Sequence, residues 1–328
     1  MQHRKLGNTS LNLSVIGLGT WAIGGGDWNF GWGEQDEREA IEGIVHAVAC
    51  GVNWIDTAPI YGDGNSEILV GRALQEIPSD QRPLIATKFG RVMQPSGTPK
   101  GCLQPDHIRR ECEISLERLG VEQIDLYQMH WPDPDEGIEA AWETMVELKE
   151  KKLVREIGVS NFSVSQLERV QKIHPVGSLQ PPYHMLRRGI EEELLPYCEN
   201  HSIGVVAYSP MSKGLLTGKF TAERAAELSD RDHRSRDPEF AQPRIGVHLE
   251  LVEKLKPLAE AAGRDVVQLA IAWVMRNPVV TSAIIGTRSP SQIEETAKAG
   301  DWNLEQSLVQ EIQTLIDEHD TQLQALQA

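Results

Sequence analysis

The chain has 328 residues, 40% of them hydrophobic, and a formal net charge of -16. This length is enough for a large core, and the acidic balance argues against a nucleic-acid partner, because nucleic-acid binders present basic faces. No apolar run approaches the ~20 residues of a membrane-spanning helix. Since the first residues lack the apolar core of a signal peptide, we expect a cytoplasmic protein. Its four scattered cysteines are then free thiols rather than a disulfide framework.

Short apolar runs alternate with helical patterns along the chain. After a hairpin over residues 3–13, eight strands are predicted at 14–20, 52–56, 84–88, 124–130, 154–160, 177–180, 203–209 and 282–287. Helical spacing of apolar residues follows each run; the first helix begins with Asp36 as cap and Glu39 as its capping-box partner, and another extends over 266–277. The strands are continuous apolar runs, which is typical of a parallel sheet buried on both faces. Eight such units predict an α/β fold, a (β/α)8 TIM barrel formed by a single domain over residues 1–328.

The regular alternation is interrupted after residue 209. Residues 221–244 are charged and contain prolines. We interpret them as a mobile excursion over the barrel mouth that serves either as an active-site lid or as a docking surface. An extra helix is expected over 247–262, and a C-terminal helix over 304–326 lies outside the repeat.

Titratable residues stand at the ends of three consecutive predicted strands. Asp56, Lys88 and His130 occupy these ends, and Tyr61 follows in the loop after Asp56. In such barrels the C-terminal strand ends carry function. Each residue alone has an ordinary structural explanation, but together they form a proton-donating site. An ammonium next to a tyrosine lowers the pKa of the phenol from its usual ~10. Asp56 can hold Lys88, and a neutral His130 can orient a carbonyl oxygen. Nothing in this set supplies an electron pair, so a hydride-donating cofactor is required.

Several motifs in this order make the sequence similar to the aldo-keto reductases over nearly its whole length. They are Gly17 to Trp21, Asn53 to Ala58 with Tyr61 and Gly62, Ala86 to Lys88, Asp125 to Trp131, Ile157 to Phe162, and Ala207 to Pro210. The Trp-rich first loop and residues 214–219 resemble the bacterial, broad-specificity branch. The resemblance implies NADPH-dependent reduction of aldehydes and ketones to alcohols. It also implies a catalytic tetrad of Asp56, Tyr61, Lys88 and His130, with Tyr61 as the proton donor.

The resemblance further implies NADPH extended across the barrel mouth. Ser160, Asn161 and Gln180 would hold the nicotinamide carboxamide, and Tyr208 would stack on the ring. The other contacts implied are Gly19, Thr20, Trp21 and Asp56, then Ser209, Pro210, Met211, Ser212, Lys213, Gly214, Leu215, Gly218 and Lys219, and finally Ile285, Gly286, Thr287, Arg288, Gln292 and Glu295.

The adenosine end of the predicted site lies where the last barrel helix begins. Ser289 is expected to cap that helix, with Pro290 at its first position and Gln292 completing a capping box. A helix N-terminus suits an anion. Arg288 offers a partner for the 2'-phosphate, which favours NADPH. Gly286 and Thr296 stand where many members of the family have Lys and Asn, so NADH stays possible.

Aromatic residues crowd the first loop. Trp21, Trp28, Phe30 and Trp32, together with Trp131, are expected to line an apolar substrate pocket beside Tyr61 and His130, although about half of the loop aromatics would only pack the loop. Aldehydes or a stacked sugar would suit such walls. No histidine pair has metal-ligand spacing, so no metal is expected. A monomer acting on a small carbonyl compound is the default expectation. The alternative is a nicotinamide-binding regulatory module of the same fold that senses redox state and docks on a partner protein.

Overall fold

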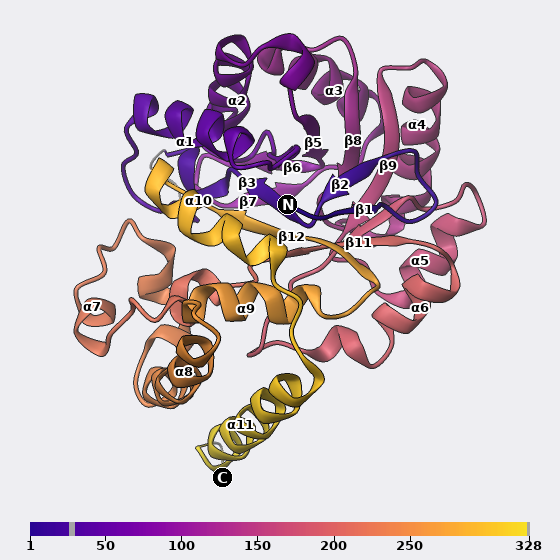
Figure 1. Ribbon diagram of the computed structural model, residues 1–328. Helices are drawn as coiled ribbons and strands as arrows, with labels where there is room; N and C mark the ends of the chain where they lie inside the picture. The colour runs from indigo at the N-terminus through magenta and orange to yellow at the C-terminus, as the bar shows by residue number, and fades with distance from the viewer. Residues whose placement is uncertain (26–29, 327–328) are drawn as a thin grey trace.

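The computed structural model describes residues 1–25 and 30–326, and in these residues eight parallel strands close into a barrel (Figure 1). In chain order the strands are β3 (Ile16–Gly19), β4 (Trp54–Asp56), β5 (Leu84–Phe89), β8 (Ile124–Met129), β9 (Val154–Ser160), β10 (Ser178–Gln180), β11 (Gly204–Tyr208) and β12 (Val280–Gly286). Each strand pairs with the next one in the chain, and β12 closes the barrel by pairing with β3. The predicted (β/α)8 barrel is therefore confirmed.

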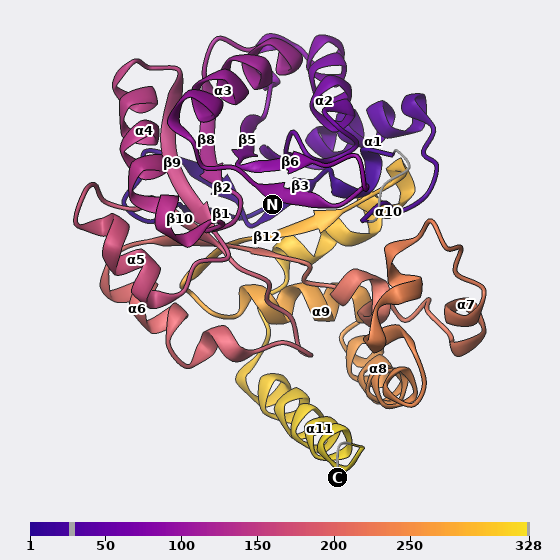
Figure 2. The same cartoon turned by 180° about the vertical axis from the view of Figure 1, so that it is seen from behind.

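Helices surround the barrel in both views (Figures 1 and 2). They are α1 (Glu37–Ala49), α2 (Asn65–Glu76), α3 (Pro105–Leu119), α4 (Ile138–Glu150), α5 (Val164–Gln171), α6 (Leu194–Asn200), α9 (Val266–Met275) and α10 (Pro290–Ala297). Most are amphipathic, as a helix with one face on the barrel should be. Helix α9 is buried along its whole length, because α8 (Arg244–Ala261) covers the side that does not face the strands.

Two antiparallel hairpins lie at opposite ends of the barrel. Strands β1 (His3–Lys5) and β2 (Asn12–Ser14) form the predicted N-terminal hairpin, which is in front in Figure 1. Its Leu6, Leu11 and Leu13 are buried in one cluster with Trp54, and so seal that end of the barrel. Strands β6 (Arg91–Met93) and β7 (Pro99–Gly101) follow β5, and β6 is in front in Figure 2. This second hairpin was not predicted, since its residues are partly exposed and lack an apolar pattern.

Several predicted boundaries need correction. The first barrel strand begins at Ile16 rather than at residue 14, because Ser14 pairs with His3 in the hairpin. The helix predicted over 266–277 ends at Met275, and the last strand begins at Val280 rather than at residue 282.

The N-cap predicted for α1 is present, although the described residues show no reciprocal bond from the Glu39 side chain, whereas the cap predicted for α10 is not made. Asp36 accepts a hydrogen bond from the backbone N–H of Glu39 as expected. Ser289 precedes α10 but makes no side-chain cap bond within the described chain, and Gln292 accepts instead from the backbone N–H of Arg288 at 2.9 Å. The predicted box is therefore wrong, and the first turn of α10 keeps its backbone N–H groups without a serine cap.

The segment 221–244 is built from short helical pieces. It contains α7 (Ala222–Ala226) and 3₁₀ turns at His233–Arg236 and Pro238–Phe240. Phe240 packs with Phe220, Leu215 and Ile245 in a small core. The segment is thus anchored beside the barrel mouth, and its mobility stays a prediction.

The long C-terminal helix, α11 (Gln306–Ala325), packs against α8. The imidazoles of His248 and His319 meet between these two helices, with 2.9 Å between Nδ1 and Nε2. Across residues 1–25 and 30–326, no helix combines the length and apolar character needed to cross a membrane.

Candidate active site

The four residues of the predicted tetrad meet at one end of the barrel. Asp56 ends β4, Lys88 is the next-to-last residue of β5, and His130 directly follows β8. The register places Asp56 opposite Ala86, and Lys88 opposite Gln128, so the three strands end at similar heights. Because parallel strands share one carboxyl edge, three neighbouring strand ends bring their side chains together.

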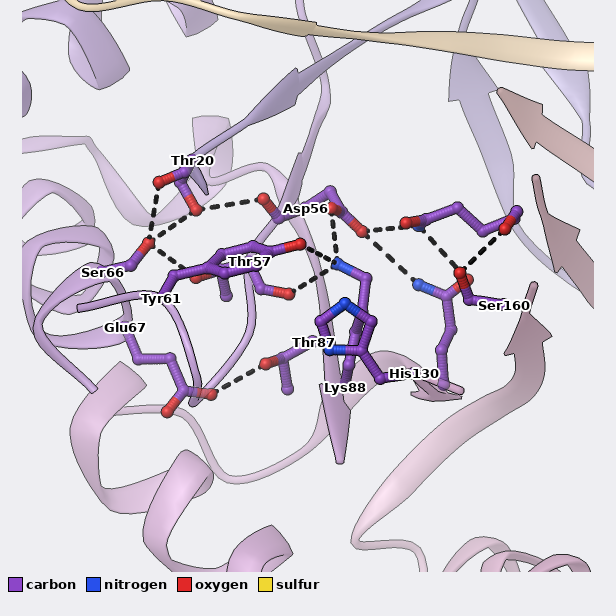
Figure 3. A network of polar contacts seen from close by, with 12 residues as sticks. Thr20, Asp56, Thr57, Tyr61, Ser66, Glu67, Thr87, Lys88, His130 and Ser160 are labelled. Atoms are coloured by element: carbon purple, nitrogen blue, oxygen red, sulfur yellow. Dashed lines mark hydrogen bonds and ion pairs between the residues drawn. The ribbon is translucent and has the colours of Figure 1, made fainter. Parts of the chain in front are cut away.

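Lys88 is the centre of this group (Figure 3). Its ammonium donates to Asp56 Oδ2 at 2.6 Å, to the carbonyl of Thr57 at 2.9 Å and to the Tyr61 hydroxyl at 3.3 Å. These bonds use all three N–H groups of a lysine, which is what a side chain with 0% exposure requires. The Tyr61 oxygen accepts from Lys88, and no acceptor for the hydroxyl proton is found in residues 1–25 and 30–326. That proton can therefore point into the cavity described below.

Asp56 is held from the opposite side by two amides. Its Oδ1 accepts from Gln180 Nε2 at 2.8 Å and from Gln128 Nε2 at 3.5 Å. Thr20 lies behind this pair, where its hydroxyl donates to the carbonyl of Asp56 at 3.1 Å. Ser66 donates to the Thr20 hydroxyl at 2.7 Å. The carboxylate thus has a fixed orientation toward Lys88.

Burial controls the protonation of the tetrad. Burial raises the pKa of Tyr61 well above its usual value, and the charge of Asp56 adds to this effect. The expectation that Lys88 lowers the pKa of the resting phenol is therefore wrong, and Tyr61 stays protonated. Burial lowers the pKa of Lys88, against the opposing effect of Asp56. Burial, aided by the charges of Lys88 and Arg91, also lowers the pKa of His130 well below its usual value, so its imidazole is neutral at physiological pH.

A cavity of about 550 Å³ opens above these residues. Asp56, Tyr61 and His130 line it, while Lys88 lies behind them. The lining includes most of the predicted cofactor set: Gly19, Trp21, Ser160, Asn161, Gln180, Tyr208, Ser209, Pro210, Met211, Lys213, Gly214, Lys219, Gly286, Thr287, Arg288, Gln292 and Glu295. Outside the lining formed by the described residues are Thr20, Ser212, Leu215, Gly218 and Ile285. Leu215 and Ile285 instead belong to buried apolar clusters.

Amide and hydroxyl groups gather on the floor of the cavity. Ser160 donates to the carbonyl of Gln180 at 2.8 Å, and Asn161 Nδ2 donates to the carbonyl of His130 at 3.0 Å. The Tyr208 hydroxyl donates to Asn161 Oδ1 at 2.9 Å. The three residues predicted to hold a carboxamide are therefore together, with the predicted stacking residue beside them.

The loop after β11 and the start of α10 both suit phosphate groups. Ser209, Ser212, Lys213 and Gly214 have left-handed backbone, with φ values of 56°, 49°, 55° and 103°. Concave turns containing such residues direct backbone N–H groups toward an anion. Gln292, in the first turn of α10, lines the cavity together with Arg288. Amide groups, left-handed turns and a helix N-terminus around one cavity fit a dinucleotide.

An aromatic wall borders the cavity beside Tyr61. The rings of Trp21 and Trp32 meet edge to face at 5.3 Å between centroids, and Trp21 lies 6.5 Å from Tyr61. Phe30 and Trp131 also line the cavity and are each 43% exposed. The predicted Trp28 lies outside the described residues.

Sequence patterns missed three residues that complete the mouth. His233 packs on both Trp21 and Trp32, at 4.8 and 4.6 Å between ring centroids. The guanidinium of Arg234 lies 4.7 Å from the ring of Trp32. Arg91 lines the cavity from β6 and pairs with Asp133 at 2.7 Å. None of the three stands at a predicted strand end, so spacing gave no signal for them.

The match to a family model decides the relationship: residues 15–317 match the description "Aldo/keto reductase family". The chain belongs to the aldo/keto reductase family. It is 38% identical over 318 residues to "Aldo-keto reductase YhdN" of Bacillus subtilis (strain 168), covering 97% of this chain and 94% of that protein. It is 34% identical over 317 residues to "NADH-specific methylglyoxal reductase" of Escherichia coli (strain K12), covering 93% and 95%.

A solved structure gives the same result for the fold. The "glycerol dehydrogenase AKR11B4 from Gluconobacter oxydans" superimposes with a TM-score of 0.87 at 36% identity, covering 97% of this chain and 95% of that one. The predicted membership, including the resemblance to bacterial members, is confirmed. This aldo/keto reductase is accordingly an oxidoreductase that acts on carbonyl groups and is expected to use a nicotinamide cofactor.

Proposed function

We propose that this aldo/keto reductase reduces aldehydes and ketones to alcohols with NADPH, and that Tyr61 supplies the proton. The observation that carries the proposal is the position of Lys88, which bonds both Asp56 and the Tyr61 oxygen. This arrangement leaves the phenol proton available at the cavity. A small carbonyl compound that fits beside the aromatic wall is the proposed substrate, with aromatic and aliphatic aldehydes as the first to test.

The chemistry divides between the cofactor and the tetrad. A bound nicotinamide supplies the hydride. Neutral His130 orients the substrate oxygen by a hydrogen bond, and Tyr61 donates its proton to that oxygen as negative charge develops there. Lys88 stabilises the phenolate that remains, and Asp56 keeps Lys88 in place. Because the ammonium is fixed before the reaction, it needs no reorientation when the charge forms.

Three groups are proposed to hold the cofactor. Ser160, Asn161 and Gln180 would bind the carboxamide, and the left-handed turn at Lys213 would face the pyrophosphate. Arg288, beside α10, would take the 2'-phosphate. The position of Gly286 offers no further cation, and one relative is named as NADH-specific. We therefore propose a preference for NADPH with NADH also accepted.

The test compares the wild type with Tyr61→Phe on a panel of aldehydes. The variant should bind NADPH as tightly as the wild type and lose about 10²- to 10⁴-fold in turnover, the usual contribution of a general acid. Tyr197→Phe, in α6 and beside His201 rather than at the cavity, is the matched control and should keep full activity. Tight NADPH binding by the wild type without turnover on any carbonyl would instead indicate a redox-sensing module. Failure to bind any nicotinamide would contradict the proposal as a whole.

A further inference from the structure

Residues 30–35 of the first barrel loop are tied to Arg288, which lines the cavity. Arg288 donates from Nε to Gln35 Oε1 at 2.7 Å and from Nη1 to the carbonyl of Trp32 at 3.2 Å. Its Nη2 donates to the carbonyl of Glu34. We call residues 30–35 the aromatic loop, because Phe30 and Trp32 are part of the aromatic wall.

The same loop is held on its other side by the segment after β11. Trp32 forms an antiparallel bridge with Asp232, and the backbone N–H of His233 donates to the carbonyl of Gly31 at 3.1 Å. Arg234 stacks over the Trp32 ring. Trp21 adds a third contact, because its Nε1 donates to the carbonyl of Phe30 at 3.0 Å. Among these supports of the aromatic loop, Arg288 is the one that also borders the predicted 2'-phosphate site.

The guanidinium has donors to spare. An arginine presents five N–H groups in a planar fork, and the three bonds to the aromatic loop leave one N–H on each terminal nitrogen. The backbone N–H of Arg288 is also fixed by Gln292 at 2.9 Å. Arg288 is half-buried and lines the cavity, so a phosphate can bond the two remaining N–H groups while the loop carbonyls keep theirs. A planar fork can bridge two acceptors in this way, whereas the point charge of a lysine cannot.

We propose that Arg288 is a positioning residue that joins the cofactor's 2'-phosphate to the substrate pocket by holding the aromatic loop. This inference rests on the proposed reductase function. Without Arg288 the loop loses three hydrogen bonds, two of them to its backbone. With NADPH the phosphate fixes the guanidinium and therefore the loop, whereas NADH has no group to do so. Carbonyl binding should thus be tighter in the presence of NADPH than with NADH.

The test uses the full-length protein and three variants. Arg288→Ala removes the tether and the charge, and Arg288→Lys keeps the charge but not the bridging fork. Gln35→Ala removes the bond from Nε and also the 3.3 Å bond from Gln35 Nε2 to the carbonyl of Arg288, and it leaves the guanidinium and its two bonds to the loop carbonyls in place. The first measurement is hydrogen exchange of residues 30–35 in the protein without cofactor. The second is the KM for a bulky aromatic aldehyde, 4-nitrobenzaldehyde, with NADH and with NADPH, together with kcat and the Kd of each cofactor.

We expect exchange in the aromatic loop to quicken about tenfold or more in Arg288→Ala and Arg288→Lys, and less in Gln35→Ala, since several modest hydrogen bonds are lost. The KM should rise about tenfold in Arg288→Ala even with NADH, where no 2'-phosphate is involved, while kcat changes little. Arg288→Lys should keep part of the preference for NADPH binding and still show the raised KM.

Two outcomes distinguish failure of the Arg288 tether from failure of the proposed reductase function. If Arg288→Ala weakens NADPH binding alone and leaves both loop exchange and the KM with NADH unchanged, Arg288 is only a phosphate anchor and the inference is overturned. If the wild type turns over no carbonyl, the reductase function fails, and unaltered loop exchange in Arg288→Ala would overturn the tether independently. Faster exchange confined to residues 30–35, with global stability unchanged, would support the tether in either case.

Discussion

Replacing Lys88 by Met gives the most direct test of how the tetrad is built. The exposed fractions of the Lys88 and Asp56 side chains are 0% and 5%, and only 2.6 Å separates Nζ from Oδ2. Removing one partner of a buried ion pair typically costs about 3–5 kcal/mol of stability.

The structure places the expected loss in the lower part of that range. Asp56 would keep the amide of Gln180 at 2.8 Å, and a hydrogen bond to a charged group contributes about 1.5–3 kcal/mol. We therefore expect Lys88→Met to lower the free energy of unfolding by about 3 kcal/mol at pH 7. Adding Asp56→Asn to this variant removes both charges and keeps an oxygen that Gln180 can still bond. The double variant should recover to within about 1 kcal/mol of the wild type.

Activity should not recover with stability. Both the single and the double variant lack the ammonium beside Tyr61, so turnover should fall about 10²- to 10⁴-fold in each. Stability is measured by urea unfolding at pH 7 without cofactor. A double variant as unstable as the single one, or one that retains turnover, would refute the reasoning.

Two further predictions concern acid stability and packing. Burial lowers the pKa of His233 from 6.5 to about 4. The unfolded chain therefore takes up this proton at a higher pH than the folded chain, and the free energy of unfolding falls as the pH drops below about 6.5. At pH 5 the loss is about 2 kcal/mol, from 1.36 kcal/mol for each of about 1.5 pH units. In urea unfolding, His233→Asn should reduce the difference in unfolding free energy between pH 7.5 and pH 5 by about 2 kcal/mol. A difference equal to that of the wild type would contradict the role of His233. A Cβ at Gly17 would lie 2.2 Å from the ring of Trp54, so Gly17→Ala should cost about 1–3 kcal/mol by overpacking. Gly189→Ala is the control, because a Cβ there meets none of the described atoms within 4 Å. Its free energy of unfolding should stay within about 0.5 kcal/mol of the wild type. Equal losses of stability in Gly17→Ala and Gly189→Ala would exclude overpacking as the cause.

The barrel could be predicted because its strands carry a strong local signal. The barrel strands β4, β5, β8, β9, β10, β11 and β12 are short apolar runs with a helical pattern after each, and a parallel sheet buried on both faces requires that composition. The hairpin of β6 and β7 has no such signal. Its strands are three residues long and partly exposed, so nothing in their composition separates them from a loop. The start of the first barrel strand could not be predicted for the same reason, since Ser14 belongs to the N-terminal hairpin rather than to the barrel.

The positions of the tetrad could be predicted for a topological reason. Consecutive strands of a parallel barrel end on one rim, so residues at three successive strand ends must be neighbours whatever the intervening loops do. The aromatic loop's tether could not be predicted in this way. Arg288 bonds the backbone carbonyls of Trp32 and Glu34. Every residue has a backbone carbonyl, so residue type gives no signal for such a contact. The bonded residues are also more than 250 positions apart in the chain. His233, which packs on Trp21 and Trp32 from the segment after β11, was missed for a similar reason.

The protonation state of Tyr61 shows why contact pairs alone mislead. Reasoning from the pair, an ammonium beside a phenol lowers the pKa of the phenol. In the folded chain the same burial that brings Lys88 to Tyr61 also removes water from both groups, and Asp56 offsets the positive charge, so the pKa of Tyr61 rises. The role of Lys88 therefore lies in the reaction rather than in the resting enzyme. The ammonium matters as the phenolate forms, and interactions that strengthen only at that stage are the ones that increase the rate.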